Sequence, residues 1–121
     1  MSATALIVDD DATLRRALGQ RLAHWGYEVR EAASGAEAIE VSRRTEHDLV
    51  LLDLSMPGLS GLDVLRALRG EGIASDVIVL TAHGSVQAAV EALRLGASDF
   101  LQKPTDFEVL RAVIDRLGPQ S

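Results

Sequence analysis

Short apolar runs alternate with longer amphipathic segments along the whole chain. The runs at 5–8, 49–52 and 77–80 are continuously apolar, which is typical of strands that helices cover on both faces. The segments 27–30 and 99–102 mix polar and apolar residues, as expected for strands at the edges of a sheet. Strands that alternate with helices in this way predict βαβ units and a parallel sheet.

Helical segments follow the strands, and several begin at recognisable caps. A Ser or Thr followed three residues later by an acid predicts a capping box, in which each side chain accepts a backbone N–H of the other residue. Gly118-Pro119 is expected to end the last helix. The predicted starts are Asp11 or Ala12, Ser34 with Glu37, Ser60 with Asp63, a position near Ser85, and Thr105 with Glu108.

Apolar residues at helical spacing define the face that each helix is expected to bury. Because only four residues are aromatic, we expect a core built mainly of Leu, Val, Ile and Ala. The predicted core-facing side chains are Leu14, Leu18, Leu22 and Trp25 in the first helix, Val86, Val90 and Leu93 in the fourth, and Phe107, Leu110, Ile114 and Leu117 in the fifth.

The two kinds of strand also predict the order of the sheet. With the second and fifth strands outermost, the order 2-1-3-4-5 gives an α/β fold, the flavodoxin-like doubly wound five-stranded parallel sheet with five helices. Right-handed crossovers then place helices one and five on one face and helices two, three and four on the other. The first and third strands become neighbours where the winding reverses, and ligands bind at such points, outside the carboxyl ends of the strands.

Length and composition restrict the class of protein. The 121 residues predict one domain, 1–121. The absence of cysteine excludes disulfides, zinc-thiolate sites and thiol nucleophiles. No basic region precedes the first apolar stretch, as a signal peptide would require, and no apolar run approaches the roughly 18 residues that span a bilayer. We therefore expect a soluble cytoplasmic domain that makes no membrane contact.

The net charge of −6 argues against a nucleic-acid-binding surface, which normally shows a basic patch. We therefore expect no nucleic acid contact by this domain. The arginine pairs 15–16 and 43–44 are interpreted as parts of solvated helix faces. An alternative for 15–16 is that the pair contributes to docking a partner beside the acidic residues described next.

Polar side chains follow the strands at the edge where a ligand is expected. Asp9 and Asp10 follow the first strand, Asp53 ends the third, and Thr81 and Lys103 end the fourth and fifth. Acids, a hydroxyl and an ammonium in these places are typical of a site that handles phosphoryl groups. Three carboxylates and one ammonium leave a formal charge of −2, which one Mg²⁺ balances, and Mg²⁺ prefers oxygen ligands. Without a cation, crowded carboxylates repel one another and tend to protonate.

Four short pieces of the sequence together resemble the response regulator receiver domain of two-component signalling. The resemblance covers essentially the whole chain, and it is specific because the pieces occur in the right order on the right strands. The stretch 81–90 is most similar to receivers of the nitrogen-regulatory, enhancer-binding type. The four pieces are Val8-Asp9-Asp10-Asp11, residues 52–58 with Gly61, Leu80-Thr81-Ala82, and Phe100-Leu101-Gln102-Lys103-Pro104.

The resemblance implies that Asp53 accepts a phosphoryl group from the phosphohistidine of a sensor histidine kinase or a phosphotransfer protein. It also implies that Asp9, Asp10, Asp53 and the main-chain carbonyl of Ser55 hold Mg²⁺. The domain would catalyse its own phosphorylation and slow dephosphorylation, and we expect no conventional enzyme activity. Gly58, in the turn after Asp53, is expected to leave the backbone free to turn sharply, and Gly61 likewise.

Two further positions would turn phosphorylation into a signal. The resemblance implies that Thr81 bonds a phosphoryl oxygen, that Lys103 pairs with another, and that Phe100 is the aromatic residue of the switch. The surface formed by the fourth helix, fifth strand and fifth helix would then change and control a partner, or an effector domain beyond Ser121. The bond between Lys103 and Pro104 is expected to be cis, which costs little for an X-Pro bond.

Several polar residues have simpler explanations. Asp11 is interpreted as a helix cap or solvated acid rather than a metal ligand, and His24 and His47 as surface residues. His83 is expected to lie exposed in a loop. Ser55 and His83 nevertheless flank the expected phosphoryl position, and an alternative role for them is to steer the water that hydrolyses the phosphate. Phe100, taken without the family pattern, is better explained by packing at the sheet edge.

Other functions fit parts of this pattern. A phosphatase of the haloacid dehalogenase type also forms an aspartyl phosphate, but it has an acid two residues after the nucleophile, where this chain has Ser55. A nucleotide-binding flavodoxin relative is disfavoured because no glycine-rich loop follows the first strand. A receiver-like interaction module that works without phosphorylation stays open as the alternative. Homodimerisation is also open, through segments that contain Val86, Ala89, Leu110 and Ala112.

Overall fold

The computed structural model describes residues 3–82 and 86–118. Over these residues, five parallel strands form a sheet in the order β2-β1-β3-β4-β5. The predicted order is confirmed, with the mixed-polarity strands at the edges. The second strand begins one residue later than predicted and extends further. The strands are β1 (Thr4–Val8), β2 (Glu28–Ala32), β3 (Leu49–Asp53), β4 (Asp76–Thr81) and β5 (Asp99–Gln102).

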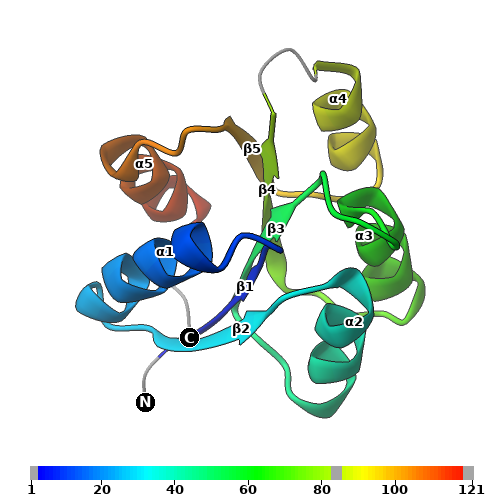
Figure 1. Cartoon of the computed structure of the whole chain (residues 1–121), viewed down its shortest axis with the longest axis horizontal. Helices are drawn as coiled ribbons and strands as arrows, with labels where there is room; N and C mark the ends of the chain where they lie inside the picture. The colour runs from blue at the N-terminus through cyan, green and yellow to red at the C-terminus, as the bar shows by residue number, and fades with distance from the viewer. Residues whose placement is uncertain (1–2, 83–85, 119–121) are drawn as a thin grey trace.

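Helices cover both faces of the sheet, as the crossover rule predicts. Figure 1 shows α1 and α5 on one side of the strands and α2, α3 and α4 on the other. No helix in the described ranges combines the length and apolar character needed to span a bilayer. The helices are α1 (Ala12–His24), α2 (Gly35–Arg44), α3 (Gly61–Gly70), α4 (Val86–Arg94) and α5 (Phe107–Leu117).

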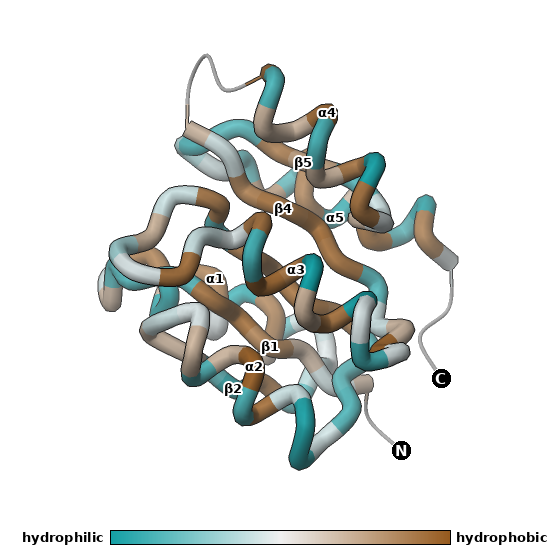
Figure 2. Tube along the Cα trace, turned by 90° about the vertical axis from the view of Figure 1, so that its right-hand side faces the viewer, coloured by the Kyte–Doolittle hydropathy of each residue, from teal (hydrophilic) through white to brown (hydrophobic). Residues whose placement is uncertain are grey.

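The core consists of two apolar layers, one on each face of the sheet. Alternate residues of the central strands point into opposite layers, because successive strand side chains face opposite sides. Leu6 and Leu52 pack with the helices α2, α3 and α4, whereas Ile7 and Leu51 pack with α1 and α5. The hydropathy colouring in Figure 2 shows apolar strands in the centre and hydrophilic residues spread over the surrounding helices and loops.

The predicted caps are largely found, with one correction. Ser60 and Asp63 form the reciprocal capping box of α3, and Asp11 caps α1 by accepting the amides of Thr13 and Leu14. Thr105 was expected to cap α5, but Asp106 does so. An aspartate is the stronger N-cap of the two, and α5 therefore starts one residue later.

The cap of α2 differs in detail from a full capping box. The Ser34 hydroxyl accepts the Glu37 amide, as predicted. The Glu37 carboxylate, however, accepts the amide of Ala33 rather than that of Ser34. The first turn of α2 is therefore still closed from both sides, with the return bond displaced by one residue.

The prediction for the buried face of α4 is wrong. Val86, Val90 and Leu93 are exposed by 64%, 42% and 41%. Ala89 and Ala92 are buried instead. The small alanine side chains let α4 pack against the rest of the fold, and the larger residues form an apolar stripe that faces outward. The predicted start near Ser85 lies outside the described residues.

The core predictions for α1 and α5 hold better. Leu18 and Leu22 of α1 are fully buried, as is Leu110 of α5, and Ile114 is nearly so. Trp25 belongs to the same layer but is only partly buried. The other predicted core residues, Leu14, Phe107 and Leu117, are also partly buried against this layer.

His47 was expected on the surface, but the structure places it in the interior. Its side chain is 2% exposed, and within the described part of the chain neither ring nitrogen makes a hydrogen bond of standard geometry. Burial lowers the pKa of the imidazole, and the positive charge of Arg30 lowers it further. Asp48 and the Thr45 backbone act in the opposite sense but do not prevail. The neutral imidazole is therefore the form that the fold accommodates.

Candidate functional site: an acidic cluster at the ends of β1 and β3

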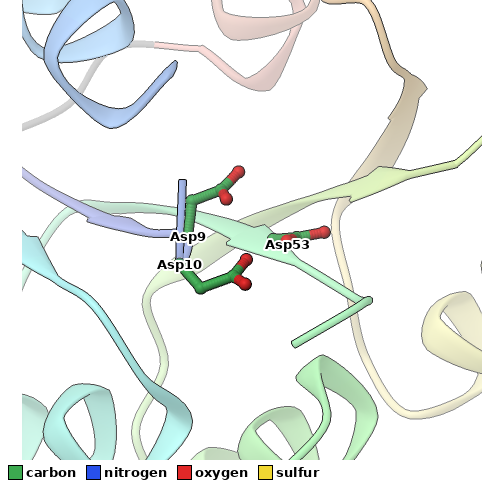
Figure 3. A group of neighbouring side chains, drawn as sticks. All are labelled: Asp9, Asp10 and Asp53. Atoms are coloured by element: carbon green, nitrogen blue, oxygen red, sulfur yellow. The ribbon is translucent and has the colours of Figure 1, made fainter. Parts of the chain in front are cut away.

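Three carboxylates meet at the carboxyl edge of the sheet. Oxygen atoms of Asp9, Asp10 and Asp53 lie within 4.8 Å of one another. The first two follow β1 and the third ends β3, and the two strands are neighbours in register. Figure 3 shows all three side chains extending beyond the ends of these strands toward the same space. The sheet order therefore produces the predicted proximity.

Burial divides the three acids. Asp9 is 0% exposed and Asp53 is 2% exposed, whereas Asp10 is exposed to solvent. Isolated buried carboxylates are costly to ionise. The two buried acids therefore depend on the hydrogen bonds and cations around them.

Lys103 supplies a positive charge to both buried acids. Its Nζ atom lies 2.9 Å from Oδ2 of Asp9 and 3.3 Å from Oδ2 of Asp53. Its backbone amide donates to the carbonyl of Thr81 at 2.8 Å, which fixes the start of the loop after β5. The bond between Lys103 and Pro104 is cis, as expected.

The other oxygen of each buried acid shapes its own loop. Oδ1 of Asp9 accepts the amide of Asp11 at 2.9 Å, and Oδ1 of Asp53 accepts the amide of Ser55 at 3.0 Å. A carboxylate that bonds the amide two residues later forms an Asx-turn, which bends the chain sharply. Each acid therefore uses Oδ1 to turn the chain and Oδ2 to face Lys103.

The pKa of Asp53 lies above the ordinary value of an aspartate. Burial raises this pKa most, and the charge of Asp9 raises it further. The Ser55 amide and Lys103 lower it without restoring its ordinary value. For Lys103, burial favours the neutral amine, but its hydrogen bond to Asp9 and the charges of both acids outweigh burial and raise its pKa. The lysine is therefore a cation, and the cluster still has an excess of negative charge.

Gly61 lets α3 approach the end of β3 closely. A Cβ atom at this position would lie 2.4 Å from the Asp53 carbonyl oxygen and 2.7 Å from the Leu54 Cα. Crowding against the backbone, rather than a special φ angle, explains this glycine. Gly58 is different, because its φ of 77° lies in the left-handed region that favours glycine. The turn after β3 thus needs both glycines, for different reasons.

The structure does not place Thr81 or Phe100 in contact with the acids. The Thr81 hydroxyl is buried and donates to the carbonyl of Leu101 on the neighbouring strand, at a long 3.4 Å. Phe100 is 40% exposed on the edge strand β5. His83 lies outside the described residues. The structure therefore brings Lys103 to the acidic cluster, whereas the Thr81 hydroxyl is turned toward β5.

The interpretation of Arg15 as part of a solvated face is wrong. Its side chain is 17% exposed and forms an ion pair with Glu31 at 2.8 Å. It also donates to the main-chain carbonyl of Asp9 at 2.7 Å. The sequence contained a signal for this position, because Arg15 precedes Leu18 by three residues and therefore lies on the buried stripe of α1.

Comparisons with known proteins identify the family. Residues 5–115 match the response regulator receiver domain. The chain is 41% identical over 112 residues to the two-component response regulator PhoP of Pseudomonas aeruginosa, covering 93% of this chain and 50% of that protein. It is 41% identical over 111 residues to the transcriptional regulatory protein ZraR of Escherichia coli, covering 92% and 25%. The chain thus spans about a quarter to a half of the length of these relatives.

Solved structures agree with this result. A response regulator receiver domain protein from Clostridium thermocellum superposes with a TM-score of 0.88 at 33% identity, covering 94% of this chain and 92% of that one. NtrX from Brucella abortus, solved in complex with ATP, gives a TM-score of 0.88 at 32% identity, covering 96% and 27%. The similarity to NtrX supports the nitrogen-regulatory resemblance of the sequence. The match over most of the chain, the shared fold and the sequence identity show that this chain belongs to the response regulator receiver domain family.

Proposed function

We propose that residues 1–121 form one receiver domain that acts as a phosphorylation-dependent switch, with Asp53 as the phosphoryl acceptor. The observation that carries the proposal is the environment of this carboxylate. It ends a fully buried strand, faces Lys103 and shares its edge with Asp9 and Asp10. A nucleophile, a cation and further acids in one place suit the transfer of a charged phosphoryl group.

The donor atoms of the cluster fit Mg²⁺. Asp9, Asp10 and Asp53 offer carboxylate oxygens, and the carbonyl of Ser55 is the fourth proposed ligand. Burial and, less strongly, the charge of Asp9 raise the pKa of Asp53, and the formal excess of negative charge in the cluster is what a divalent cation would compensate. When bound, Mg²⁺ supplies positive charge that stabilises the carboxylates and the phosphoryl oxygens.

The residues of the chain then have distinct tasks in transfer. The Ser55 amide holds Oδ1 of Asp53 and so fixes the rotation of the nucleophilic carboxylate. A carboxylate oxygen attacks phosphorus, the phosphorus–nitrogen bond of the donor's phosphohistidine breaks, and its electron pair stays on the imidazole, which is protonated as it leaves. Lys103, already beside Asp53, pairs with an oxygen of the transferred group.

Thr81 and Phe100 would carry the signal away from the site. The bond from the Thr81 hydroxyl to the Leu101 carbonyl is 3.4 Å long, near the limit for a hydrogen bond. Little is lost when the hydroxyl turns to a phosphoryl oxygen instead. The released carbonyl belongs to the residue after Phe100, so the change reaches β5 directly. The result is a shift between two packings of the surface formed by α4, β5 and α5.

The partners follow from the same proposal. The donor is a sensor histidine kinase or a phosphotransfer protein in the cytoplasm. Relatives such as ZraR are longer than this chain, and we propose that an output domain following Ser121, or a separate partner, reads the changed surface. Transcription control is the output that the similarity to the transcriptional regulatory protein ZraR favours. The exposed stripe of α4 is available for a homodimer contact.

A labelling experiment tests this function. The wild-type protein, incubated with acetyl phosphate and Mg²⁺, is expected to gain one phosphoryl group by intact-protein mass spectrometry. Asp53→Asn is expected to gain none. Asp11→Asn is the matched control, because asparagine caps a helix about as well as aspartate, and it is expected to label like the wild type. Equal labelling of Asp53→Asn would refute the assignment.

A further inference from the structure

Asp10 is the proposed metal ligand with the least support from its own side chain. It is exposed, and within the described residues its carboxylate makes no hydrogen bond. Asp9 and Asp53, by contrast, each have one carboxylate oxygen fixed by a backbone amide. The position of the Asp10 carboxylate therefore depends on how firmly the backbone that carries it is held.

The backbone before Asp10 is held from both sides. The amide of Asp9 donates to the carbonyl of Ala32 at 3.2 Å, which extends the pairing of β1 with β2. The carbonyl of Asp9 accepts from Nη1 of Arg15 at 2.7 Å. This carbonyl belongs to the peptide group that joins Asp9 to Asp10, so the bond from Arg15 fixes the plane from which the Asp10 side chain projects.

Arg15 is itself oriented by a second contact. Its Nε donates to Oε1 of Glu31 at 2.8 Å, and Glu31 lies on β2 opposite Ile7 of β1. A planar guanidinium that bonds two acceptors with different nitrogens has a fixed direction, which a lysine cannot reproduce. The Arg15 side chain is mostly buried. It reaches from α1 to Glu31 on β2 and to the carbonyl of Asp9 after β1.

We propose that Arg15, oriented by Glu31, is a positioning residue for the cation site. It holds the peptide between Asp9 and Asp10 so that the exposed Asp10 carboxylate faces the two buried acids. The proposal rests on the function proposed above, because it concerns the same cation. Groups that orient metal ligands typically change metal affinity by roughly 10–100-fold when they are removed.

A charge effect of Arg15 and a positioning effect of Arg15 predict opposite changes in the affinity for a divalent cation, so an experiment can distinguish them. Arg15→Met removes a positive charge near three acids and leaves Glu31 unbalanced. If Arg15 acted only through its charge, this variant would bind a divalent cation more tightly. If Arg15 positions the ligand loop, the variant binds more weakly despite the favourable change in charge.

The experiment measures Mn²⁺ binding by electron paramagnetic resonance of the free ion, since Mn²⁺ prefers the same oxygen ligands. Arg15→Met is expected to weaken binding about tenfold. The charge-balanced double variant Arg15→Met with Glu31→Gln is expected to be weakened as well, and Arg15→Lys to recover part of the loss. Arg16→Met, on the exposed side of α1, is the matched control and is expected to bind like the wild type.

Unfolding of each variant in EDTA separates positioning from stability. A purely structural role would lower the free energy of unfolding and leave the Mn²⁺ dissociation constant of the folded protein unchanged, which would overturn the proposal. Unchanged or tighter binding by Arg15→Met would do the same. If Arg15→Met does not fold, Arg15→Lys decides: weakened binding supports the proposal, and wild-type affinity overturns it.

Mn²⁺ binding by the wild type and by Asp10→Asn distinguishes a failure of the role proposed for Arg15 from a failure of the proposed cation site. If the wild type binds Mn²⁺ and Asp10→Asn abolishes this binding, the cation site stands whatever Arg15→Met does. If the wild type does not bind Mn²⁺ at all, the cation site and the role of Arg15 are both refuted.

Discussion

The ammonium of Lys103 lies 2.9 Å from Oδ2 of Asp9, although 94 positions separate the two residues in sequence. Asp9 follows β1 and Lys103 follows β5, with β3 and β4 between them in the sheet. The contact therefore links the beginning of the fold to its end, across the residue proposed as phosphoryl acceptor. It also leaves two buried carboxylates dependent on one cation.

Removing that cation should destabilise the metal-free protein. For Lys103→Met in EDTA we expect the free energy of unfolding to fall by about 2 kcal/mol at neutral pH, because two buried acids lose their cation. This is less than for a fully buried pair, since the Lys103 side chain is 26% exposed. Urea denaturation measures the change. Arg94→Met, on the exposed end of α4, should have little effect, and equal stability of the two variants would contradict this account.

The raised pKa of Asp53 predicts that replacing this residue increases the stability of the protein, and that the increase depends on pH. In the folded protein the carboxyl ionises at a higher pH than its ordinary value of 3.8, so ionisation favours the unfolded chain. In EDTA, Asp53→Asn should be more stable than the wild type at neutral pH. The gain should shrink as the pH falls through the raised pKa and should vanish below 3.8, where the carboxyl becomes protonated in both states.

Denaturation at several pH values measures this gain. Glu46→Gln replaces an exposed acid and should show no comparable pH-dependent gain. A variant Asp53→Asn that is less stable than the wild type at neutral pH would show that the ionised carboxylate stabilises the fold, against the direction of its pKa.

Alanine substitutions at two glycines of α3 test whether the helix is crowded against the end of β3. Gly61→Ala places a Cβ atom against the Asp53 carbonyl and should cost more than about 2 kcal/mol of stability, since rigid backbone must move. Gly70→Ala meets no atom within 4 Å and should stabilise the helix by roughly 0.5–1 kcal/mol. Thermal unfolding compares them. Tolerance of alanine at Gly61 would argue against a tight contact between α3 and the end of β3.

His47 predicts a loss of stability on mild acidification. Its pKa in the folded protein is below the ordinary 6.5, so the unfolded chain takes up a proton first as the pH falls below that value. Above pH 6.5, His47 should not lower the free energy of unfolding. Between pH 6.5 and the lower pKa of the folded protein, the free energy of unfolding should fall. Urea denaturation from about pH 7.5 to about pH 5 follows this loss.

Replacing the imidazole should remove that dependence. His47→Leu should flatten the stability profile over the same range, whereas His24→Gln, at an exposed position, should retain the wild-type slope. If His47→Leu shows the full slope, other groups are responsible for it.

The fold was largely predictable because its signals are local. Continuously apolar runs distinguish the central strands β1, β3 and β4 from the mixed edges, and that distinction determines the sheet order. The outward face of α4 was not predictable in the same way. An apolar stripe such as that of Val86 and Val90 shows the same periodicity whether it faces the core or the solvent, and the packing of Ala89 against the fold decides between them.

The site was predictable to the extent that it lies at strand ends. The order of the sheet brings Asp53 beside Asp9, and the end of β5 brings Lys103 to both. Side-chain direction was not available from such reasoning. The Thr81 hydroxyl turns toward a β5 carbonyl, and Arg15 turns toward the Asp9 carbonyl and Glu31 of β2. Both directions depend on how the strands that carry these acceptors are assembled.

The most direct test of the central claim identifies the phosphorylated residue itself. An acyl phosphate is reduced by borohydride, which converts the modified aspartate to homoserine, and peptide mass spectrometry then locates that residue. After treatment with acetyl phosphate and Mg²⁺, we predict homoserine at position 53 and unmodified aspartate at positions 9 and 10. Homoserine at another acid, or none at position 53 in protein that carries a phosphoryl group, would contradict the account.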